Sequence, residues 1–356
     1  MWTKINHTTY NGNLNNYSYP TNKEFGGLLV FLKQIATNKQ IYLIDRLGWN
    51  PKYPPTDYDI YIICAFGESF NTDILHRLEN DPAFADKQIV LLTSQFYQGP
   101  EFKRTKIFYI EHLHALIPFL QKPEYTKLQT RKFTHGSLSN RNAMHKALVT
   151  AKLLGKFGNK LQYTFCNTPS SEYDQTTFTS GWQKLISEFE LTITDSEIEL
   201  LNYIHVNPIK APGHTWTLDN RVLKDSKLLW TCESMFVSCD DQPVAYLTEK
   251  IMKSIVTGCC FVLVSQERST ERLKLLGFES FESEFKLDYD SDVDSIRYKK
   301  IFEFIDTFDQ DKLLDSPAIQ ELVDYNHNHF YHTFYDHVTK TNVDKIQQAI
   351  EYINAI

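Results

Sequence analysis

The stretch "YDIYIICAFGESFNTDILHRLENDPAFADKQIVLLTSQ", residues 58–95, contains two apolar runs separated by an amphipathic segment. The first run, "YDIYIICAFG", is rich in β-branched and aromatic residues and predicts a buried strand. Residues 71–81 have the apolar spacing of a helix, and residues 87–95 predict a second strand. Strand, helix and strand in this order are typical of a parallel α/β sheet.

The same alternation continues on both sides of this stretch. Residues 40–45 predict a strand, and residues 106–121 predict a strand that runs into a helix. Sites in parallel α/β sheets lie at the carboxyl ends of the strands. The polar residues expected at those ends are Asp45, Glu68, Gln95, Glu111 and His112.

A change of composition marks the middle of the chain. Residues 122–160 contain nine lysines and arginines and one acid, Glu124. We interpret this segment as a link that enters a second α/β unit, with a strand at 132–139 and a helix at 140–157. Asn140 is the expected N-cap of that helix.

The charges in this segment have two explanations. A solvated basic face accounts for them without any ligand. Alternatively, Arg141, His145 and Lys146 lie in the first two turns of the predicted helix, where they would form an anion site.

The segment "AYLTEKIMKSIVTGCCFVLVS", residues 245–265, predicts a helix followed by a buried strand. Thr248 is placed to cap the helix, and Glu249 in the first turn suits the helix dipole. Lys250 does not suit it, because a cation near a helix N-terminus is unfavourable. A lysine that costs stability at this position is a candidate for ligand binding. The preceding strand is expected to end at Glu233.

Bulk composition limits the class of protein. The chain has 356 residues, enough for two domains, and 42% of them are hydrophobic, as in a globular protein. Its net charge of -7 argues against polyanion binding through bulk charge. No apolar run approaches the roughly 18 residues of a membrane span, and the polar start of the chain is unlike a signal peptide. The six cysteines form no CxxC pair, which is typical of reduced thiols, so we expect a cytoplasmic protein.

Short motifs exclude several enzyme classes and leave no metal site. The chain has no GxGxxG, P-loop or GxSxG motif, which argues against dehydrogenases, kinases and hydrolases. The acidic run at residues 288–294 alternates like a calcium loop but has Val293 and Lys299 where glycine and glutamate are required. The histidines of residues 326–337 do not have the spacing of a zinc site.

Two segments resemble the donor-binding signature of the α1,3-fucosyltransferases: "KLLWTCES", residues 227–234, and "YLTEKIMKSIVTGCCFVLVS", residues 246–265. In that family a strand ends in Phe-Glu-Asn, and Tyr-[Val/Ile]-Thr-Glu-Lys then opens a helix before an apolar strand. The chain is also similar to phage-type glycosyltransferases. Their LGF segment corresponds to "STERLKLLGFESF", residues 269–281, and their upstream Asn-Arg…His-Arg element to "SNRNAMHKAL", residues 139–148.

The resemblance implies an α/β protein with a GT-B-like fold. Such a fold has two Rossmann-like domains that face a central cleft, and here a C-terminal helix would close the chain. The expected parts are an acceptor-side domain at residues 1–128, a nucleotide-sugar-binding domain at residues 129–330 and the closing helix at residues 331–356.

The resemblance also assigns roles to residues of the TEK segment. Glu249 would bind the ribose of the nucleotide and Lys250 its diphosphate, with Tyr246 and Thr248 in the same signature. Glu233 lies at the matching strand end and would shape the donor pocket.

A second phosphate contact would come from the upstream element, through Arg141, His145 or Lys146. No divalent metal and no other cofactor is expected, because positive side chains neutralise the leaving diphosphate. The nucleotide-diphosphate sugar would then be the donor substrate.

One position departs from the fucosyltransferase pattern. That family places a catalytic carboxylate in a Gly-Glu-Asn context after an N-domain strand, whereas the comparable strand here ends in Ser94-Gln95. Glutamine cannot act as a general base. The remaining candidates at strand ends are Glu68, Glu111 and His112, with Glu68 placed first, although a role in a cap or turn explains each of them equally well.

The expected function is therefore a Leloir-type glycosyltransferase that moves a hexosyl or pentosyl unit to an acceptor hydroxyl. The acceptor would be a glycan or, for a phage-encoded enzyme in the host cytoplasm, a hydroxymethylated DNA base, with residues 122–160 available for phosphate contacts. The alternative is a non-catalytic nucleotide- or glycan-binding module with a degenerate active site, which Gln95 favours. An epimerase that acts on nucleotide sugars is a third possibility.

Overall fold

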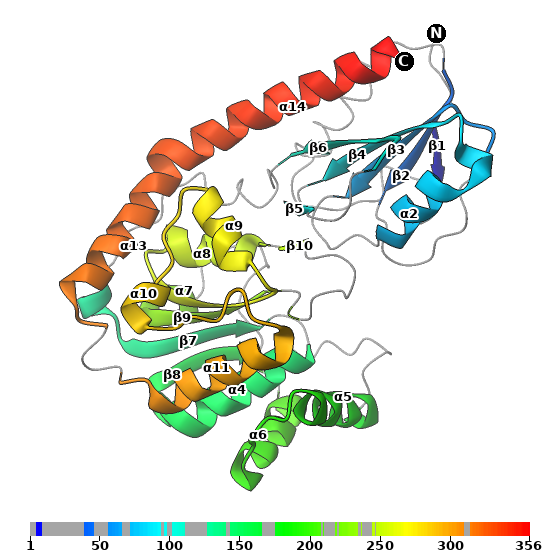
Figure 1. Cartoon of the computed structure of the whole chain (residues 1–356). Helices are drawn as coiled ribbons and strands as arrows, with labels where there is room; N and C mark the ends of the chain where they lie inside the picture. The colour runs from blue at the N-terminus through cyan, green and yellow to red at the C-terminus, as the bar shows by residue number, and fades with distance from the viewer. Residues whose placement is uncertain are drawn as a thin grey trace. The chain divides into compact units, whose positions relative to one another are not determined.

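The computed structural model describes most of the chain (Figure 1). The described residues are 5–8, 39–45, 56–65, 72–93, 96–97, 102–110, 127–139, 143–165, 175–207, 209, 218, 221–233, 236, 244–245, 247–309 and 314–356. The chain divides into two compact units, one of Met1–His114 with Tyr335–Ile356 and one of Ala115–Phe334. The last helix thus belongs to the first unit, and the cleft expected between the domains stays a prediction.

The first unit contains a parallel five-stranded sheet. Its strands follow the order β1-β2-β3-β4-β6. Their bounds are β1 Ile5–Thr8, β2 Ile41–Asp45, β3 Ile60–Ala65, β4 Gln88–Thr93 and β6 Thr105–Tyr109, and the unit also has helices α2 Thr72–Asn80 and α14 Tyr335–Ala355, the short strand β5 Phe96–Tyr97 and a 3-10 turn at Pro82–Phe84. The strand, helix and strand predicted over residues 58–95 are confirmed.

The core of the first unit forms because the apolar strands pack against the last helix of the chain. Ile60 and Val90 on neighbouring strands are fully buried, and Ala349, Ile350 and Ile353 of α14 pack in the same cluster. These three residues share one face of the helix. The amphipathic closing helix predicted from the sequence is therefore present, and its apolar face covers the first sheet.

The second unit contains a parallel four-stranded sheet in the order β11-β9-β7-β8. The strand bounds are β7 Phe133–Ser139, β8 Leu161–Phe165, β9 Ser226–Cys232 and β11 Cys260–Val264, with the short strand β10 at Val244–Ala245. The helices are α4 Met144–Phe157, α5 Gln175–Glu188, α6 Asp195–Val206, α7 Arg221–Asp225, α8 Glu249–Val256, α9 Ser269–Leu275, α10 Glu282–Phe285, α11 Asp294–Thr307 and α13 Pro317–His329. Two 3-10 turns, Leu128–Thr130 and Gly158–Lys160, and a π-helical turn, Phe330–Phe334, complete it.

The strand order of the second sheet reverses between β7 and β9. From β7 the chain passes through α4 to β8 on one side, and from β9 it passes through α8 to β11 on the other. Figure 1 shows α4 and α11 on one face of this sheet and α8 on the opposite face. A reversal of this kind leaves a crevice at the carboxyl ends of the two central strands, where parallel α/β sheets bind ligands. Among the described strands of the first sheet, the order does not reverse.

The start of α4 differs from the prediction. The helix begins at Met144, and its N-cap is Ala143, whose backbone is extended and whose side chain cannot accept a hydrogen bond. The assignment of Asn140 as the N-cap was therefore wrong. Side-chain capping favours asparagine over alanine, so local propensity predicted the earlier start, but the helix begins four residues after Asn140. As a result, α4 has no side-chain cap and no acid in its first turn.

The predicted helix stop at Gly277 is confirmed. Gly277 follows the end of α9 with a φ of +85°, and its N–H donates to the carbonyl oxygen of Lys274 at 2.9 Å. A Cβ atom at this position would lie 2.5 Å from Nε2 of His329. Glycine is thus required both by the left-handed backbone and by the packing of α13.

We expect Gly277→Ala to lower the free energy of unfolding by about 1–3 kcal/mol, because it combines a left-handed backbone with a side-chain clash. Urea unfolding followed by circular dichroism measures this change. Gly158 has a φ of +51° but open space around it, so Gly158→Ala is the matched control and should lose only the backbone part. Equal losses in the two variants would contradict the role given to His329.

Candidate active site

The candidate site lies at the carboxyl edge of the second sheet, where the strand order reverses. Glu233 directly follows β9, Thr248 caps α8, and α4 begins directly after Ala143. The structure brings the first turns of these two helices to the same strand end: His145 of α4 lies 3.1 Å from the carbonyl oxygen of Glu233, and Lys250 of α8 lies 3.9 Å from its carboxylate.

Glu233 is fully buried and accepts hydrogen bonds from the start of α8. Its Oε1 accepts from the backbone N–H of Thr248 at 3.1 Å and of Ile251 at 3.4 Å, and its Oε2 accepts from the hydroxyl of Thr248. Burial raises the pKa of Glu233, whereas Lys250 and Thr248 oppose that change. The described contacts use both carboxylate oxygens, so Glu233 fixes the helix start and orients the TEK segment.

Lys250 lies on the solvent-facing side of this hydrogen-bond network. Its ammonium group lies 3.2 Å from Oε1 of Glu249 and 3.0 Å from the hydroxyl of Thr248. The side chain of Lys250 is 17% exposed and that of Glu249 12% exposed, so both reach solvent while Glu233 does not. Thr248 also accepts from the backbone N–H of Lys250 at 3.2 Å, which confirms it as the N-cap of α8.

The first turn of α4 supplies a histidine and a lysine. His145 faces the backbone of Glu233, and burial lowers the pKa of His145 to about 3, so its ring is neutral and its Nε2–H donates to that carbonyl. Lys146 is 2% exposed, and burial, with Lys250 as the next cause, lowers its pKa to about 7. Its electrostatic interactions with Glu233, Glu249 and Lys250 place it in the same site.

The two carboxylates of the site differ in charge state. Burial disfavours the ionised form of Glu249, but Lys250 and Lys253 outweigh burial and lower its pKa to about 2. Glu249 is therefore an anion near neutral pH and can accept hydrogen bonds from ligand hydroxyls. Lys253, one turn further along α8, is buried, and its pKa is lowered to about 8.

Lysines and helix N-termini together outnumber the carboxylates at this edge. Lys146, Lys250 and Lys253 face two carboxylates, and α4 and α8 both begin here. Helix N-termini carry partial positive charge and free N–H groups, which favour phosphate oxygens. The arrangement can bind a phosphorylated ligand whose hydroxyl groups reach Glu249.

The sequence analysis missed two further residues of the site, Lys253 and Arg297. Lys253 lies one helical turn after Glu249 in "TEKIMK", and this i, i+4 spacing is a signal that could have found it. Arg297 of α11 is fully buried, and its guanidinium donates to the carbonyl oxygens of Phe236 at 2.7 Å and Ser265 at 3.0 Å. Arg297 thus ties together the segments that follow β9 and β11, and nothing local in the sequence marks it.

Several predicted site residues lie outside the described residues, so their roles stay predictions. These are the base candidates Glu68, Glu111 and His112, the donor-site candidates Arg141 and Tyr246, and the strand-end pair Ser94-Gln95.

The acidic run after α10 serves the start of a helix. Asp290 accepts from the backbone N–H groups of Thr270 and Glu271 at 2.8 and 2.9 Å, and so holds the first turn of α9. Asp294 pairs with Arg297 at 2.5 Å. Across the described ranges, no group of three or more histidine, cysteine or acidic side chains is arranged to hold a metal ion.

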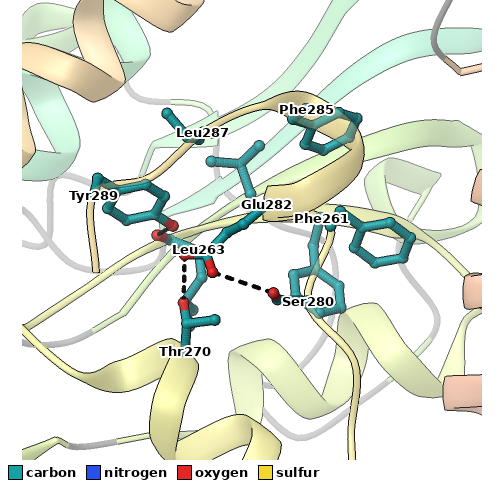
Figure 2. A pocket seen from close by; sticks show the side chains of 10 residues that line it. Phe261, Leu263, Thr270, Ser280, Glu282, Phe285, Leu287 and Tyr289 are labelled. Atoms are coloured by element: carbon teal, nitrogen blue, oxygen red, sulfur yellow. Dashed lines mark hydrogen bonds between the residues drawn. The ribbon is translucent and has the colours of Figure 1, made fainter. Parts of the chain in front are cut away.

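A second hollow lies between β11, α9 and α10 (Figure 2). It encloses about 230 Å³, including the space at its mouth. Figure 2 shows the carboxyl group of Glu282 bonded to the hydroxyls of Thr270 and Ser280, at 2.9 and 3.2 Å. Burial raises the pKa of Glu282. Apolar side chains make up most of the remaining wall, and no lysine or arginine lines the hollow.

In the part of the chain that the structure describes, we find no helix with both the length and the apolar character that a membrane crossing needs.

Comparisons with known proteins give two distant structural likenesses. No protein-family model matches the chain, and no curated protein matches its sequence. The structure of α,α-trehalose 6-phosphate synthase from Burkholderia multivorans is similar with a TM-score of 0.40 and 10% identity, over 93% of this chain and 76% of that one. A glycosyltransferase from Rickettsia africae ESF-5 is similar with a TM-score of 0.35 and 12% identity, over 89% of this chain and 94% of that one. TM-scores this low assign neither a fold nor an activity.

Proposed function

We propose that the chain is a glycosyltransferase that binds a nucleotide-diphosphate sugar at the carboxyl edge of its second sheet. The observation that carries the proposal is the meeting of two helix N-termini, each with a lysine in its first turn, at the point where the strand order reverses. Such a crevice is where parallel α/β sheets hold nucleotides, and the lysines Lys146 and Lys250 match the charge of a diphosphate.

The donor contacts in this proposal follow from the charges of the site. Lys250 binds the diphosphate from α8, and Lys146 with the uncapped start of α4 binds it from the other side. Glu249 accepts the ribose hydroxyls, consistent with its low pKa. Glu233 does not bind the ligand directly in this proposal, because both of its carboxylate oxygens already accept hydrogen bonds from the start of α8.

Transfer breaks the bond between the sugar and the diphosphate, and the departing diphosphate gains negative charge. Ammonium groups already held in place stabilise that charge without reorganisation. In this proposal lysines supply the stabilisation, and no cofactor is needed. The acceptor is a hydroxyl of a glycan or of a hydroxymethylated DNA base, and Glu68, Glu111 or His112 removes its proton.

A thermal-shift panel of UDP, GDP, CDP, dTDP and ADP tests the donor site. We expect one diphosphate to raise the melting temperature by several degrees, because a ligand that binds only the folded state stabilises it. The rise should be the same with EDTA and with magnesium, since lysines neutralise the charge. The absence of a rise with every nucleotide would overturn the proposal.

A non-catalytic nucleotide-binding module is the second candidate. It is favoured by Gln95, which occupies the position where the resembled family has its catalytic carboxylate. Turnover separates the two functions: a transferase incubated with the matching nucleotide sugar slowly releases free sugar even without acceptor, whereas a binding module does not. Sugar release can be followed by chromatography over hours.

Glu249 provides a specific test of the ribose contact. We expect the 2′-deoxy form of the matching nucleotide to bind about 10- to 150-fold more weakly, because a hydrogen bond to a charged group contributes roughly 1.5–3 kcal/mol. Glu249→Ala should bind both forms equally. Glu303→Ala on the exposed face of α11 is the matched control and should keep the preference. Calorimetric dissociation constants measure the preference for the ribose form over the 2′-deoxy form. If Glu249→Ala keeps this preference, Glu249 does not contact the ribose.

A further inference from the structure

The Lys146 side chain is buried, and its ammonium group has no acceptor among the described residues. Its residue is 2% exposed, and among the described residues no hydrogen bond or ion pair involves that group. It lies in the first turn of α4, where the partial positive charge of the helix N-terminus also disfavours a cation. A buried charge in such a position is expensive, so the neutral amine is favoured while the site is empty.

The neighbours of Lys146 do not supply the missing partner. The titratable and charged groups on the elements around it are His145 on α4, Cys232 and Glu233 at the end of β9, Glu249, Lys250 and Lys253 on α8, Arg297 and Tyr298 on α11, and Glu197 on α6. Glu233 accepts from Thr248 and Ile251, and Glu197 pairs with Lys152 at 3.0 Å. Arg297 donates to backbone carbonyls.

Burial shifts the pKa values of several groups at this site. Burial lowers the pKa of His145 to about 3 and raises that of Cys232 to about 12, so both stay neutral. Burial lowers the pKa of Lys146 to about 7 and that of Lys253 to about 8. These two lysines therefore exchange protons between pH 6 and 9.

We propose that Lys146 is a neutral amine in the empty site and that a dianionic diphosphate ester binds together with one proton, which Lys146 takes up from solvent. This inference rests on the proposed diphosphate site. The ligand supplies the acceptor that the ammonium group lacks, and its two negative charges offset the repulsion from Lys250. Binding is thereby linked to pH through the site itself.

The affinity for the diphosphate ester falls as the pH rises. Binding raises the pKa of Lys146 above its value in the empty site, so the contribution to affinity is complete below pH 7 and is lost as the pH rises toward the pKa of the bound form. Lys253 adds a smaller effect in the same direction, because its pKa in the empty site is already about 8.

The test uses P1,P2-dimethyl diphosphate as the probe, because its two charges do not titrate in this range. With a pKa of about 10.4 for both lysines in the bound state, we expect the dissociation constant to rise roughly 50-fold from pH 7.0 to 8.5. Calorimetry in buffers of different ionisation enthalpy should find more than one proton taken up per ligand at pH 8, that is, about one by Lys146 and about half by Lys253.

Two variants separate Lys146 from Lys253. Lys146→Arg keeps the charge at every pH, and Lys146→Met removes it at every pH, so both should show only a roughly fourfold change and about half a proton. Lys146→Arg should bind more tightly than Lys146→Met, and thermal melts confirm which variant is folded. If a folded variant keeps the pH dependence of the native chain, or the native chain binds without pH dependence, the inference is wrong while the diphosphate site stands. A native chain that binds no probe at any pH overturns both.

Discussion

Lys250→Ala is expected to weaken binding of the matching nucleoside diphosphate by about 10- to 150-fold and to leave the fold intact. The lost interaction is a charge-assisted hydrogen bond, which contributes roughly 1.5–3 kcal/mol. Folding should be nearly unaffected, because a lysine in the first turn of a helix opposes the helix dipole and the ammonium group is partly exposed. Calorimetric dissociation constants and thermal melts of the same preparations measure the two effects separately.

Two further variants make this result interpretable. Lys250→Arg keeps the charge and should retain most of the affinity. Lys184→Ala removes a lysine that is 72% exposed on α5, and it should change neither binding nor stability. If Lys250→Ala unfolds the chain, or if it binds the nucleotide as the native chain does, Lys250 is not the diphosphate contact.

Glu233→Ala should cause the largest loss of stability. It removes the buried acceptor of two backbone N–H groups and of the Thr248 hydroxyl, and each buried donor left without a partner costs about 1–3 kcal/mol. We expect the free energy of unfolding to fall by about 4 kcal/mol in urea titrations. Nucleotide binding should be lost as well, because the start of α8 is no longer held.

Glu233→Gln is the matched control. Its carbonyl oxygen can still accept from the N–H groups of Thr248 and Ile251, so the loss of stability should be about half that of Glu233→Ala. The negative charge facing Lys146 and Lys250 is removed, which should further depress the pKa of Lys146. Equal losses in the two variants would show that the charge of Glu233, rather than its hydrogen bonds, holds α8 in place.

Local signals in the sequence predicted much of the second unit. The apolar runs that became β9 and β11, the cap at Thr248 and the stop at Gly277 are all visible within windows of a few residues. Capping and left-handed turns depend on neighbouring backbone groups, so a single sequence carries them. In α4 the same reasoning was wrong, because Asn140 has the better capping propensity but the helix begins after Ala143.

The sequence could not show which charges are buried together. Lys146 and Lys250 are more than 100 residues apart, yet they interact at one strand end. Their meeting depends on the strand order β11-β9-β7-β8, which places α4 and α8 on opposite faces with both N-termini at one edge. Arg297 is similar, because its carbonyl partners come from loops after two different strands.

By itself, the sequence determined a parallel α/β architecture and the TEK helix, because hydrophobic periodicity and capping depend on residues that are close along the chain. The tertiary structure alone decided that Glu233 caps that helix from another element and that the buried Lys146 has no acceptor in the part of the chain that the structure describes. Burial and long-range pairing arise from packing between distant segments. The pKa values and hydrogen bonds that give the candidate site its chemistry therefore exist only in the folded chain.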